Sequence, residues 1–370
     1  MKQRLGMICI VALLLASTAG FASELSENLA KIELPEGFSI EIFAEGLENP
    51  RQLALGDQGT VFAGTSKAGK VYAIHVDDGD NVAPGVYIID EGLDLPNGVA
   101  FKFGSLYVGA LDRILRYDDI ESLLDRAPEP DLVTSNLPDK THHGRRYLRF
   151  GPDGFLYVAV GAPCNVCDEP GFAVILRMFP DGSDEGIFAS GVRNSVGYTF
   201  HPDTGEMWFT DNGRDMLGDD IPADELNRAS KAGQHFGFPY CHQGDLLDPE
   251  FGQGKSCDNY TPPEVKLGPH VAALGLTFYA GRVFPEHYNK SIFIARHGSW
   301  NRSEKIGYDI AVVHFDGEGN PLGPEVFASG WLQGQVAWGR PSDVLQLPDG
   351  SLLVSDDTAG AIYRISYSAD

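Results

Sequence analysis

Gly59-Thr60-Val61-Phe62-Ala63 is the first of six similar stretches that decide the fold. The other five are Gly104-Ser105-Leu106-Tyr107-Val108, Gly154-Phe155-Leu156-Tyr157-Val158, Gly205-Glu206-Met207-Trp208-Phe209, Lys290-Ser291-Ile292-Phe293-Ile294 and Gly350-Ser351-Leu352-Leu353-Val354. Successive stretches begin 45, 50, 51, 85 and 60 residues apart. A β-rich stretch that recurs at such a spacing is typical of a fold built from repeated supersecondary units.

An apolar strand and a turn precede each repeated stretch. The turn is clearest at Pro152-Asp153-Gly154 and Pro348-Asp349-Gly350, where proline presets the turn and glycine accepts a positive φ. A third strand follows several stretches, as at Ala361-Ile362-Tyr363-Arg364-Ile365. These features, with almost no helical periodicity, predict an all-β fold, a six-bladed β-propeller of four-stranded antiparallel blades. A β-sandwich is the alternative, but it should not show one strand recurring six times.

The interval of 85 residues is longer than the other spacings. It contains an acidic segment and the loop between Cys241 and Cys257, so an insertion around residues 211–270 is a simpler explanation than a seventh blade. The strand at Phe38–Phe43 is expected to close the ring by pairing with the C-terminal blade. Residues 23–370 are therefore predicted to form a single propeller domain.

The first 22 residues are predicted to be a secretory signal peptide. Lys2 and Arg4 precede an apolar run from Met7 to Leu15, and small residues lead up to Ala22. The run is too short for a permanent membrane helix, and no later stretch reaches the roughly 20 apolar residues that a span requires. We therefore expect a periplasmic or secreted mature chain without a transmembrane segment.

Charge excludes one class of partner. The chain has 28 Lys and Arg residues against 52 Asp and Glu residues, a formal net charge of -24. This balance leaves no basic face broad enough to neutralise the phosphates of a nucleic acid. A composition with 43% hydrophobic and 22% charged residues is that of a globular protein.

Four cysteines remain after the predicted signal peptide, and they allow three disulfide connectivities in an oxidising compartment. Proximity in the sequence favours Cys164 with Cys167 and Cys241 with Cys257. The first pair could instead be a redox or metal-binding pair. No strand–helix context surrounds it, however, and Asp168 follows where a c-type haem attachment pattern would need histidine. Structural disulfides are the favoured interpretation.

Polar side chains precede the repeated strands at comparable positions. His143 and Arg193 both lie nine residues before the prolines of their Pro-Asp turns, and Arg340 lies eight residues before Pro348. Similar positions in other blades hold His270, Asn97 and Arg51. Because a closed ring brings equivalent positions of all blades to one end of a central channel, these groups should converge there and bind an anionic ligand. Taken singly, each is more simply a loop residue with local hydrogen bonds.

Several segments, in this order, resemble the signature segments of the soluble quinoprotein sugar dehydrogenases. This family comprises the glucose, aldose sugar and sorbosone dehydrogenases that use pyrroloquinoline quinone. The segments are His143-Gly144-Arg145-Arg146-Tyr147-Leu148-Arg149-Phe150-Gly151-Pro152-Asp153-Gly154, Gly191-Val192-Arg193-Asn194, Asp211-Asn212-Gly213, Asp224-Glu225-Leu226-Asn227 and Arg340-Pro341-Ser342-Asp343-Val344. The resemblance runs from about Leu34 to the C-terminus and implies a six-bladed propeller with the cofactor at the channel mouth.

The resemblance assigns His143 as the general base that takes the hydroxyl proton of a sugar while hydride passes to the quinone. His142 is the alternative, but the offset from Pro152 favours His143. Histidine suits the role because its unperturbed pKa of about 6.5 lies near working pH. Cofactor contacts are expected from Arg193, Asn194, Arg340, Asn212, His270, His297 and Asn97. Arginine pairs with carboxylates through two contacts, and Trp300 could stack on a planar ring.

A calcium ion polarises the quinone in this family, and the resemblance places it at the backbone carbonyls of Gly213 and Arg214. Asp224 and Glu225 follow and supply the hard oxygen ligands that calcium prefers. The residues alone indicate a solvated acidic loop first and a metal site second, because no EF-hand spacing is present.

The sequence thus predicts a periplasmic quinoprotein oxidoreductase that oxidises an aldose or a related sugar or aldehyde. Pyrroloquinoline quinone and Ca²⁺ would be its cofactors, and a soluble or membrane-linked acceptor would take the electrons. One alternative is a non-catalytic propeller that binds a sugar or a partner protein on the same face. Another is a calcium-dependent propeller lactonase, which would use carboxylate and asparagine ligands without needing His143, Arg193 and Arg340 together.

Overall fold

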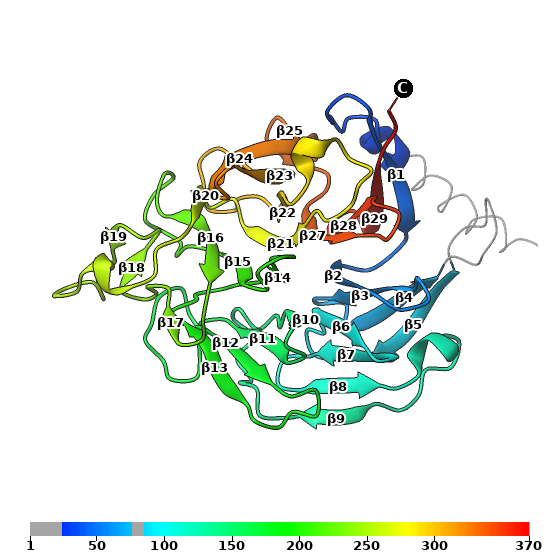
Figure 1. Ribbon diagram of the computed structural model, residues 1–370, viewed down its shortest axis with the longest axis horizontal. Helices are drawn as coiled ribbons and strands as arrows, with labels where there is room; N and C mark the ends of the chain where they lie inside the picture. Colours follow the sequence, from blue (N-terminus) through cyan, green and yellow to red (C-terminus); the bar gives the residue numbers. More distant parts are fainter. Residues whose placement is uncertain (1–23, 76–84, 370) are drawn as a thin grey trace, which may run out of the picture.

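The structure is a computed structural model that describes residues 24–75 and 85–369. The predicted signal peptide, residues 1–22, lies outside the described residues. Six sheets are arranged in a ring, which confirms the predicted six-bladed β-propeller (Figure 1). No helix in the described ranges is both long enough and apolar enough to cross a membrane.

Each of the first three blades contains four strands in antiparallel order. The first blade contains β2 (Pro50–Leu55), β3 (Val61–Thr65), β4 (Lys70–His75) and β5 (Gly85–Glu91). The second contains β6 (Gly98–Lys102), β7 (Ser105–Gly109), β8 (Ile114–Tyr117) and β9 (Asp131–Thr134). The third contains β10 (Leu148–Phe150), β11 (Leu156–Val160), β12 (Val174–Met178) and β13 (Gly186–Ser190).

The remaining blades complete the ring. The fourth contains β14 (Tyr198–Phe200), β15 (Met207–Asp211), β16 (Ala223–Ala229) and β20 (Val265–Pro269). The fifth contains β21 (Ala273–Phe278), β22 (Ile292–Arg296), β23 (Asp309–Phe315) and β24 (Pro321–Ala328). The sixth contains β27 (Pro341–Gln346), β28 (Leu352–Asp356), β29 (Ala361–Tyr367) and β1 (Phe38–Glu45).

The six repeated stretches contribute the second strand of every blade, namely β3, β7, β11, β15, β22 and β28. Nearly every residue of these strands is buried, because neighbouring blades cover both faces of each sheet. Aromatic rings fill the space between blades. Examples are the pairs Phe62–Phe101, Tyr107–Phe150, Tyr157–Phe200 and Trp208–Phe278, whose ring centroids lie 5.0 to 6.0 Å apart.

The two ends of the propeller domain meet in the sixth blade. Strand β1 pairs antiparallel with β29, with Phe38 opposite Tyr367. The Phe38 ring packs edge-on against Phe284 with centroids 4.7 Å apart. This pairing confirms the predicted ring closure. A short helical segment at residues 24–29 precedes β1, and its Leu25 and Leu29 pack against the same core.

Short elements lie between and beside the blades. They are η1 (Ile120–Ser122), β17 (Gln234–His235), β18 (Cys241–His242), β19 (Leu246–Leu247), η2 (Cys257–Asn259), η3 (Glu286–Tyr288), β25 (Leu332–Gln333) and β26 (Val336–Ala337). Elements β17, β18, β19 and η2 lie between β16 and β20, within the segment where an insertion was predicted. Strand β17 pairs parallel with β13, so the third blade gains a fifth strand that the sequence repeat did not predict.

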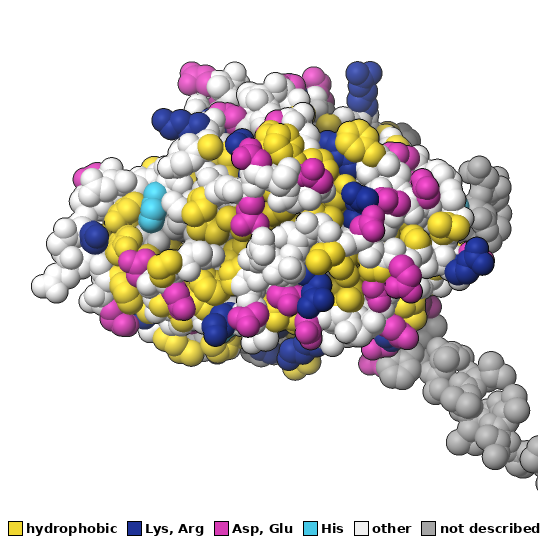
Figure 2. Space-filling view, turned by 90° about the horizontal axis from the view of Figure 1, so that it is seen from below, with side chains coloured by type: hydrophobic (Ala, Val, Ile, Leu, Met, Phe, Trp, Pro, Cys, Tyr) yellow, Lys and Arg dark blue, Asp and Glu magenta, His cyan; other side chains and the backbone are white. Residues whose placement is uncertain are grey.

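Both predicted disulfides are present, Cys164–Cys167 and Cys241–Cys257. The outer flank of the ring, which includes β9 and β13, carries acidic, basic and hydrophobic side chains intermixed (Figure 2). Leu132 on β9 is 58% exposed and Ile187 on β13 is 57% exposed. Acidic side chains on this flank therefore lie among basic and exposed hydrophobic side chains.

Buried polar side chains connect the strands that surround the channel. The Gln52 Oε1 accepts hydrogen bonds from the backbone N–H groups of Leu148 (3.0 Å) and Val99 (3.2 Å), which belong to two other blades. The Asp343 Oδ2 accepts from the Leu53 N–H at 2.8 Å. These bonds fix the first strands of neighbouring blades relative to one another, and those strands position the cavity described next.

Candidate functional site

A cavity of about 310 Å³ lies where the chain enters strands β2, β10, β14, β21 and β27. Its size lies at the lower end of the range for small-molecule sites. The cavity brings together most of the predicted site residues: His143, Arg193, Asn194, Asn212, Gly213, Asp224, His270, His297, Trp300 and Arg340. Three predicted residues, Asn97, Arg214 and Glu225, lie outside its lining.

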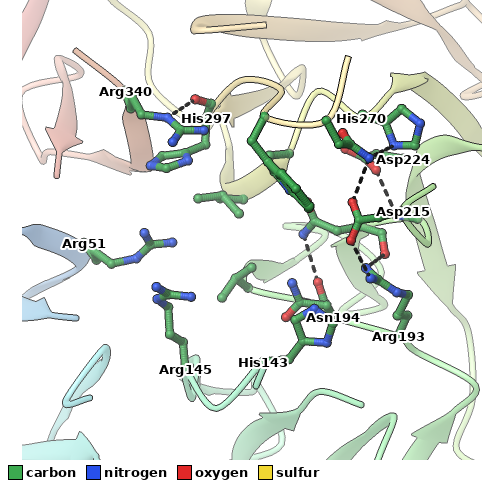
Figure 3. A pocket seen from close by; sticks show the side chains of 17 residues that line it. Arg51, His143, Arg145, Arg193, Asn194, Asp215, Asp224, His270, His297 and Arg340 are labelled. Atoms are coloured by element: carbon green, nitrogen blue, oxygen red, sulfur yellow. Dashed lines mark hydrogen bonds and ion pairs between the residues drawn. The ribbon is translucent and has the colours of Figure 1, made fainter. Parts of the chain in front are cut away.

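Positive charge dominates the wall. Four guanidinium groups line the cavity, those of Arg51, Arg145, Arg193 and Arg340. The side chains of Arg51, from the first blade, and Arg145, from the segment that enters the third blade, project toward the same space (Figure 3). The charge of Arg51 and burial lower the pKa of Arg145 to about 10. Arg51 pairs with Asp357, whereas the Arg145 Nε donates to the Ser66 hydroxyl, and a guanidinium held near another positive charge is costly without a counter-charge. The arrangement therefore suits an anionic ligand, as the sequence predicted.

His143 is held in one orientation. Its backbone has a φ of +49°, a conformation that histidine seldom adopts and that is associated with functional sites. The Nδ1–H donates to the Ala162 carbonyl at 2.8 Å, which leaves the Nε2 lone pair of the neutral ring as the basic site. Burial and then the charge of Arg193 lower the His143 pKa to about 2, so the ring is neutral near pH 7. The expectation that this pKa lies near working pH is therefore wrong for the ligand-free protein, because it rested on the unperturbed value.

A glycine allows His143 to take this place. A Cβ atom added at Gly161 would lie 2.6 Å from the His143 Cβ, so any larger residue would displace the histidine. The His142 ring lies with its centroid 4.1 Å from that of His143, but His142 is exposed and lies outside the lining. The geometry supports the choice of His143 over His142.

Arg193 is held by the protein itself. Its side chain is 3% exposed. The Nε donates to the Asn165 backbone carbonyl (2.8 Å) and Nη1 donates to that of Asn212 (3.1 Å). The Nη2 donates to the Asn165 Oδ1 (2.9 Å) and to the Asp215 Oδ2 (3.0 Å). Because every nitrogen of this guanidinium already donates, Arg193 presents a fixed positive charge rather than a free fork.

A second histidine, His297, faces the cavity from the opposite side as part of a chain of polar contacts. Its Nε2 lies 2.8 Å from the Asp357 Oδ1, and the other oxygen of Asp357 accepts from Arg51. Burial lowers the pKa of His297 to about 4, so the contact with Asp357 is a hydrogen bond to a neutral ring near pH 7. Although burial opposes it, the contact with His297 and the charge of Arg51 lower the pKa of Asp357. The Arg340 Nε donates to the His297 carbonyl at 2.9 Å and Nη2 donates to that of Gly298 at 2.6 Å. These contacts join the fifth, sixth and first blades.

The other predicted cofactor contacts have mainly structural partners. The Nε2 of His270 lies 2.9 Å from the Gly218 carbonyl and 3.0 Å from that of Ile221. The Asn212 amide donates to the Asn194 carbonyl at 2.9 Å. Asn97 stands behind the wall, where its Oδ1 accepts from the Arg51 Nε at 2.9 Å. It thus orients Arg51 from outside the cavity.

The predicted metal ligands divide between the cavity and the core. Gly213 and Asp224 line the cavity, and the Asp224 oxygens accept from the backbone N–H groups of Gly213 (2.8 Å) and Ala273 (3.3 Å). The Arg214 guanidinium pairs with Asp248, away from the cavity. Among the described residues, no group of three or more His, Cys, Asp or Glu side chains is arranged to hold a metal ion.

Glu225 belongs to a buried acidic pair. It lies opposite Asp211 across β15 and β16, and its Oε1 accepts from the Gln243 N–H while its Oε2 accepts from Asn227. Burial first, and then repulsion from Asp211, raises the pKa of Glu225 to about 8. The folded protein therefore holds a proton that an unfolded glutamate releases near pH 4.5. The free energy of unfolding should fall as pH rises from about 4.5 to 8.

Replacing Glu225 with glutamine should raise the melting temperature at pH 8 by about 2 °C or more, and by less at pH 5. The amide cannot ionise, and the Asn227 Oδ1, which lacks a hydrogen-bond partner within the described part of the chain, could accept from it after a flip. Differential scanning calorimetry at both pH values measures the effect. The exposed Glu318→Gln is the control. An equal gain at both pH values would contradict the assignment.

Four residues that line or support the cavity were missed by the sequence analysis: Arg145, Asn301, Asp357 and Asn165. Two of these had a usable signal. Arg145 lies within the segment that begins at His143, two positions further on. Asp357 follows β28 as Asn212 follows β15, and the acids before them act alike: Asp211 accepts from the Arg193 N–H and Asp356 from the Arg340 N–H, each at 2.8 Å.

Sequence comparisons place the chain among known proteins. The family model described as TrAA12-like matches residues 32–368. An uncharacterized protein of Borreliella burgdorferi is 33% identical over 373 residues, which cover 97% of this chain and 96% of the relative. A pyrroloquinoline quinone-dependent pyranose dehydrogenase of Coprinopsis cinerea is 29% identical over 132 residues, which cover 29% of this chain and 16% of the relative.

Solved structures share the fold. The calcium structure of the Trichoderma reesei family AA12 enzyme aligns with a TM-score of 0.78 and 19% identity, covering 91% of this chain and 97% of that one. The holo form of the pyranose dehydrogenase PQQ domain from Coprinopsis cinerea aligns with a TM-score of 0.76 and 19% identity, covering 90% and 97%. These structural similarities establish the propeller architecture.

Proposed function

This chain belongs to the TrAA12-like family, and from that membership and the geometry of its cavity we propose that it is a pyrroloquinoline quinone-dependent dehydrogenase of an aldose or a related sugar or aldehyde. One observation carries the proposal: four guanidinium groups surround a neutral histidine in a cavity of ligand size. Pyrroloquinoline quinone is a planar tricarboxylate, and arginine forks pair well with carboxylates. A relative with a named activity uses the same cofactor.

The residues present fit such a ligand. The positive charge of Arg51 acts on Arg145 even though Arg51 is paired with Asp357, so a carboxylate of the ligand beside Arg145 would relieve a cost already present in the protein. Arg193 and Arg340 add positive charge from the other blades. Their guanidinium groups are held by backbone carbonyls and, for Arg193, by Asp215, so they keep their positions without the ligand. Preorganised charge of this kind lowers the cost of binding.

His143 would act as the general base. The bound quinone would supply the chemistry of accepting hydride from the substrate carbon. The Nε2 of His143 would take the hydroxyl proton of the sugar. Burial and the charge of Arg193 disfavour the positive charge formed on the ring, so the hydrogen bond from Nδ1–H to Ala162 and the negative charge of the bound quinone would have to stabilise it. The hydrogen bond also holds the tautomer that leaves Nε2 free to accept.

We propose that calcium binds together with the quinone, at the carbonyl oxygens of Gly213 and Arg214 and near Asp224. Because the described residues contain no ready cluster of side-chain ligands, calcium alone should shift the melting temperature by less than about 1 °C. Quinone and calcium together should raise it by several degrees through mass action. Thermal melts of the apo protein with each component and with both test this. A large shift with calcium alone would contradict it.

The direct test is reconstitution. The apo protein is titrated with pyrroloquinoline quinone and calcium, and sugar-dependent dye reduction is then measured with a panel of aldoses and sugar aldehydes. We expect saturable quinone binding and dye reduction with at least one substrate. If wild type binds the quinone no more tightly than an Arg145→Met, Arg340→Ala double variant, the dehydrogenase proposal fails. Quinone binding without activity would favour a non-catalytic binding protein.

The cavity lining contains carboxylates and asparagines, the groups that the lactonase alternative would use, but it also concentrates four guanidinium groups that this alternative does not need. The two lining carboxylates among the described residues, Asp215 and Asp224, already accept hydrogen bonds from Arg193, Asn301 and backbone donors. The dehydrogenase proposal accounts for more of the lining.

We propose further that the chain is exported and that a separate carrier, soluble or membrane-linked, takes its electrons. Periplasmic recovery of a mature protein that begins at Ser23, identified by mass spectrometry, tests the export proposal.

A further inference from the structure

A short loop closed by the Cys164–Cys167 disulfide lies behind the wall of the cavity and carries Asn165. The Asn165 Oδ1 accepts from the Arg193 Nη2 at 2.9 Å and from the Asp215 N–H at 2.8 Å. Its Nδ2 donates to the Asp215 carbonyl at 3.1 Å, and its own carbonyl accepts from the Arg193 Nε at 2.8 Å. One asparagine thus makes four hydrogen bonds to two residues that line the cavity.

The same segment contacts the proposed base. The Ala162 carbonyl accepts from the Nδ1–H of His143 at 2.8 Å, and the Ala162 N–H donates to the Arg193 carbonyl at 2.7 Å. A shift of the loop would therefore disturb the arginine and the histidine together. Such coupling between a supporting loop and two functional side chains is what holds a site in its productive geometry.

The disulfide has a small effect on the unfolded chain. Cross-linking residues three apart removes less chain entropy than the Cys241–Cys257 link, which joins residues 16 apart. Its local effect is larger, because four residues between and including the cysteines cannot move independently. An arginine side chain loses much rotamer freedom when it is fixed. If Asn165 already holds Arg193 rigidly, less of that freedom has to be lost when a ligand binds.

We propose that Asn165 is a positioning residue that sets the Arg193 guanidinium, and that the Cys164–Cys167 disulfide holds Asn165 for that purpose. Without the Asn165 side chain, Nη2 keeps only Asp215, whose backbone N–H loses its own acceptor. The guanidinium keeps its bonds to the backbone carbonyls of Asn165 and Asn212, but its Nη2 and the Asp215 carboxylate are then free to move together. The position of the positive charge on this side of the cavity becomes less fixed. Asn165 itself lies outside the lining.

The test uses the apo protein and an arginine-specific reagent. Phenylglyoxal labelling of each arginine is followed by peptide mass spectrometry, with the more accessible Arg145 as the internal reference. Arg193 should resist labelling in wild type, because its side chain is 3% exposed. Asn165→Ala and the Cys164→Ser, Cys167→Ser double variant should each raise the Arg193 labelling rate about tenfold or more, the effect expected from losing a charge-assisted hydrogen bond.

Val166→Ala is the matched control, because Val166 lies in the same closed loop but does not line the cavity described above. It also does not line a second, smaller cavity of about 160 Å³ whose lining includes Ala162 and Cys167. Its labelling should stay within about twofold of wild type. A variant that merely loosens the fold would raise Arg145 and Arg193 labelling together and lower the melting temperature. Unchanged Arg193 labelling in Asn165→Ala, or in the double serine variant, would overturn the proposal.

A second readout rests on the proposed function. Asn165→Ala should weaken pyrroloquinoline quinone binding about tenfold, measured as a dissociation constant with the apo protein, while Val166→Ala should not. If wild type fails to bind the quinone, the proposed function is wrong, but the labelling result still decides the role of Asn165. If the quinone binds equally to wild type and Asn165→Ala, the positioning role is refuted and the dehydrogenase proposal stands.

Discussion

Replacing His143 with alanine should lower the rate of sugar oxidation by the quinone-loaded protein by about 10²- to 10⁴-fold, the usual contribution of a general base. Quinone binding should stay within a few-fold of wild type, because the four guanidinium groups that would hold the ligand are untouched. The physical reason is the loss of the Nε2 lone pair, which is held available by the bond from Nδ1–H to Ala162. Single-turnover reduction of the bound quinone measures the effect.

His142→Ala is the control for this prediction, since that ring is an exposed neighbour outside the cavity lining. It should retain most of the wild-type rate. The opposite result, with full activity in His143→Ala and a large loss in His142→Ala, would transfer the base to His142. Equal losses in both would show that the pair acts through packing, because the two ring centroids lie only 4.1 Å apart.

Arg145→Met should weaken quinone binding by about 10- to 100-fold without lowering the melting temperature of the apo protein. Loss of a charge-assisted contact to a carboxylate accounts for the weaker binding. Removing the repulsion between Arg145 and Arg51 offsets the lost hydrogen bond from Nε to Ser66. Such a trade between stability and function is common where a site concentrates like charge. Titration of the quinone and thermal melts of the same samples measure both effects.

Arg126→Met is the control. It changes the net charge by the same amount as Arg145→Met, but Arg126 is exposed and lies outside the cavity lining. Its quinone affinity should equal that of wild type. A matching loss in Arg126→Met would mean that the overall charge of the protein, rather than the cavity, draws the ligand. A fall in apo melting temperature for Arg145→Met alone would show that Arg145 is structural.

The ring could be predicted from the sequence because the second strand of every blade is buried on both faces. Burial requires the same apolar sequence pattern at each of these strands, so the pattern recurs six times along the chain. The sequence also predicted that Arg193 and Arg340 converge, because they enter their blades at equivalent positions, and both line the same cavity. It could not give the direction of each side chain. Asn97 and Arg51 occupy similar positions in the sequence, yet Arg51 reaches the cavity and Asn97 lies behind it, accepting the Arg51 Nε–H.

The metal prediction shows a second limit. In a strand, neighbouring residues point to opposite faces, so Asp224 reaches the cavity while the adjacent Glu225 turns into the core. An acidic run in a sequence cannot distinguish these two environments until the register of β16 is known. The parallel pairing of β17 with β13 was missed for a related reason, since two residues are too few to show a pattern.

The closure of the ring by β1 and β29 also bears on how the protein is made. Arg51 lies in β2, the first strand of the first blade, whereas its partner Asp357 lies between β28 and β29 of the sixth blade. During synthesis the first blade emerges early but waits for almost the whole polypeptide before this ion pair can form. A nascent chain halted before β28 would contain His143, Arg193, His297 and Arg340, but it would lack Asp356 and Asp357. Those two carboxylates accept hydrogen bonds from the Arg340 N–H, from His297 and from Arg51. The wall formed by Arg51, His297 and Arg340 therefore gains these partners only when the sixth blade is nearly complete.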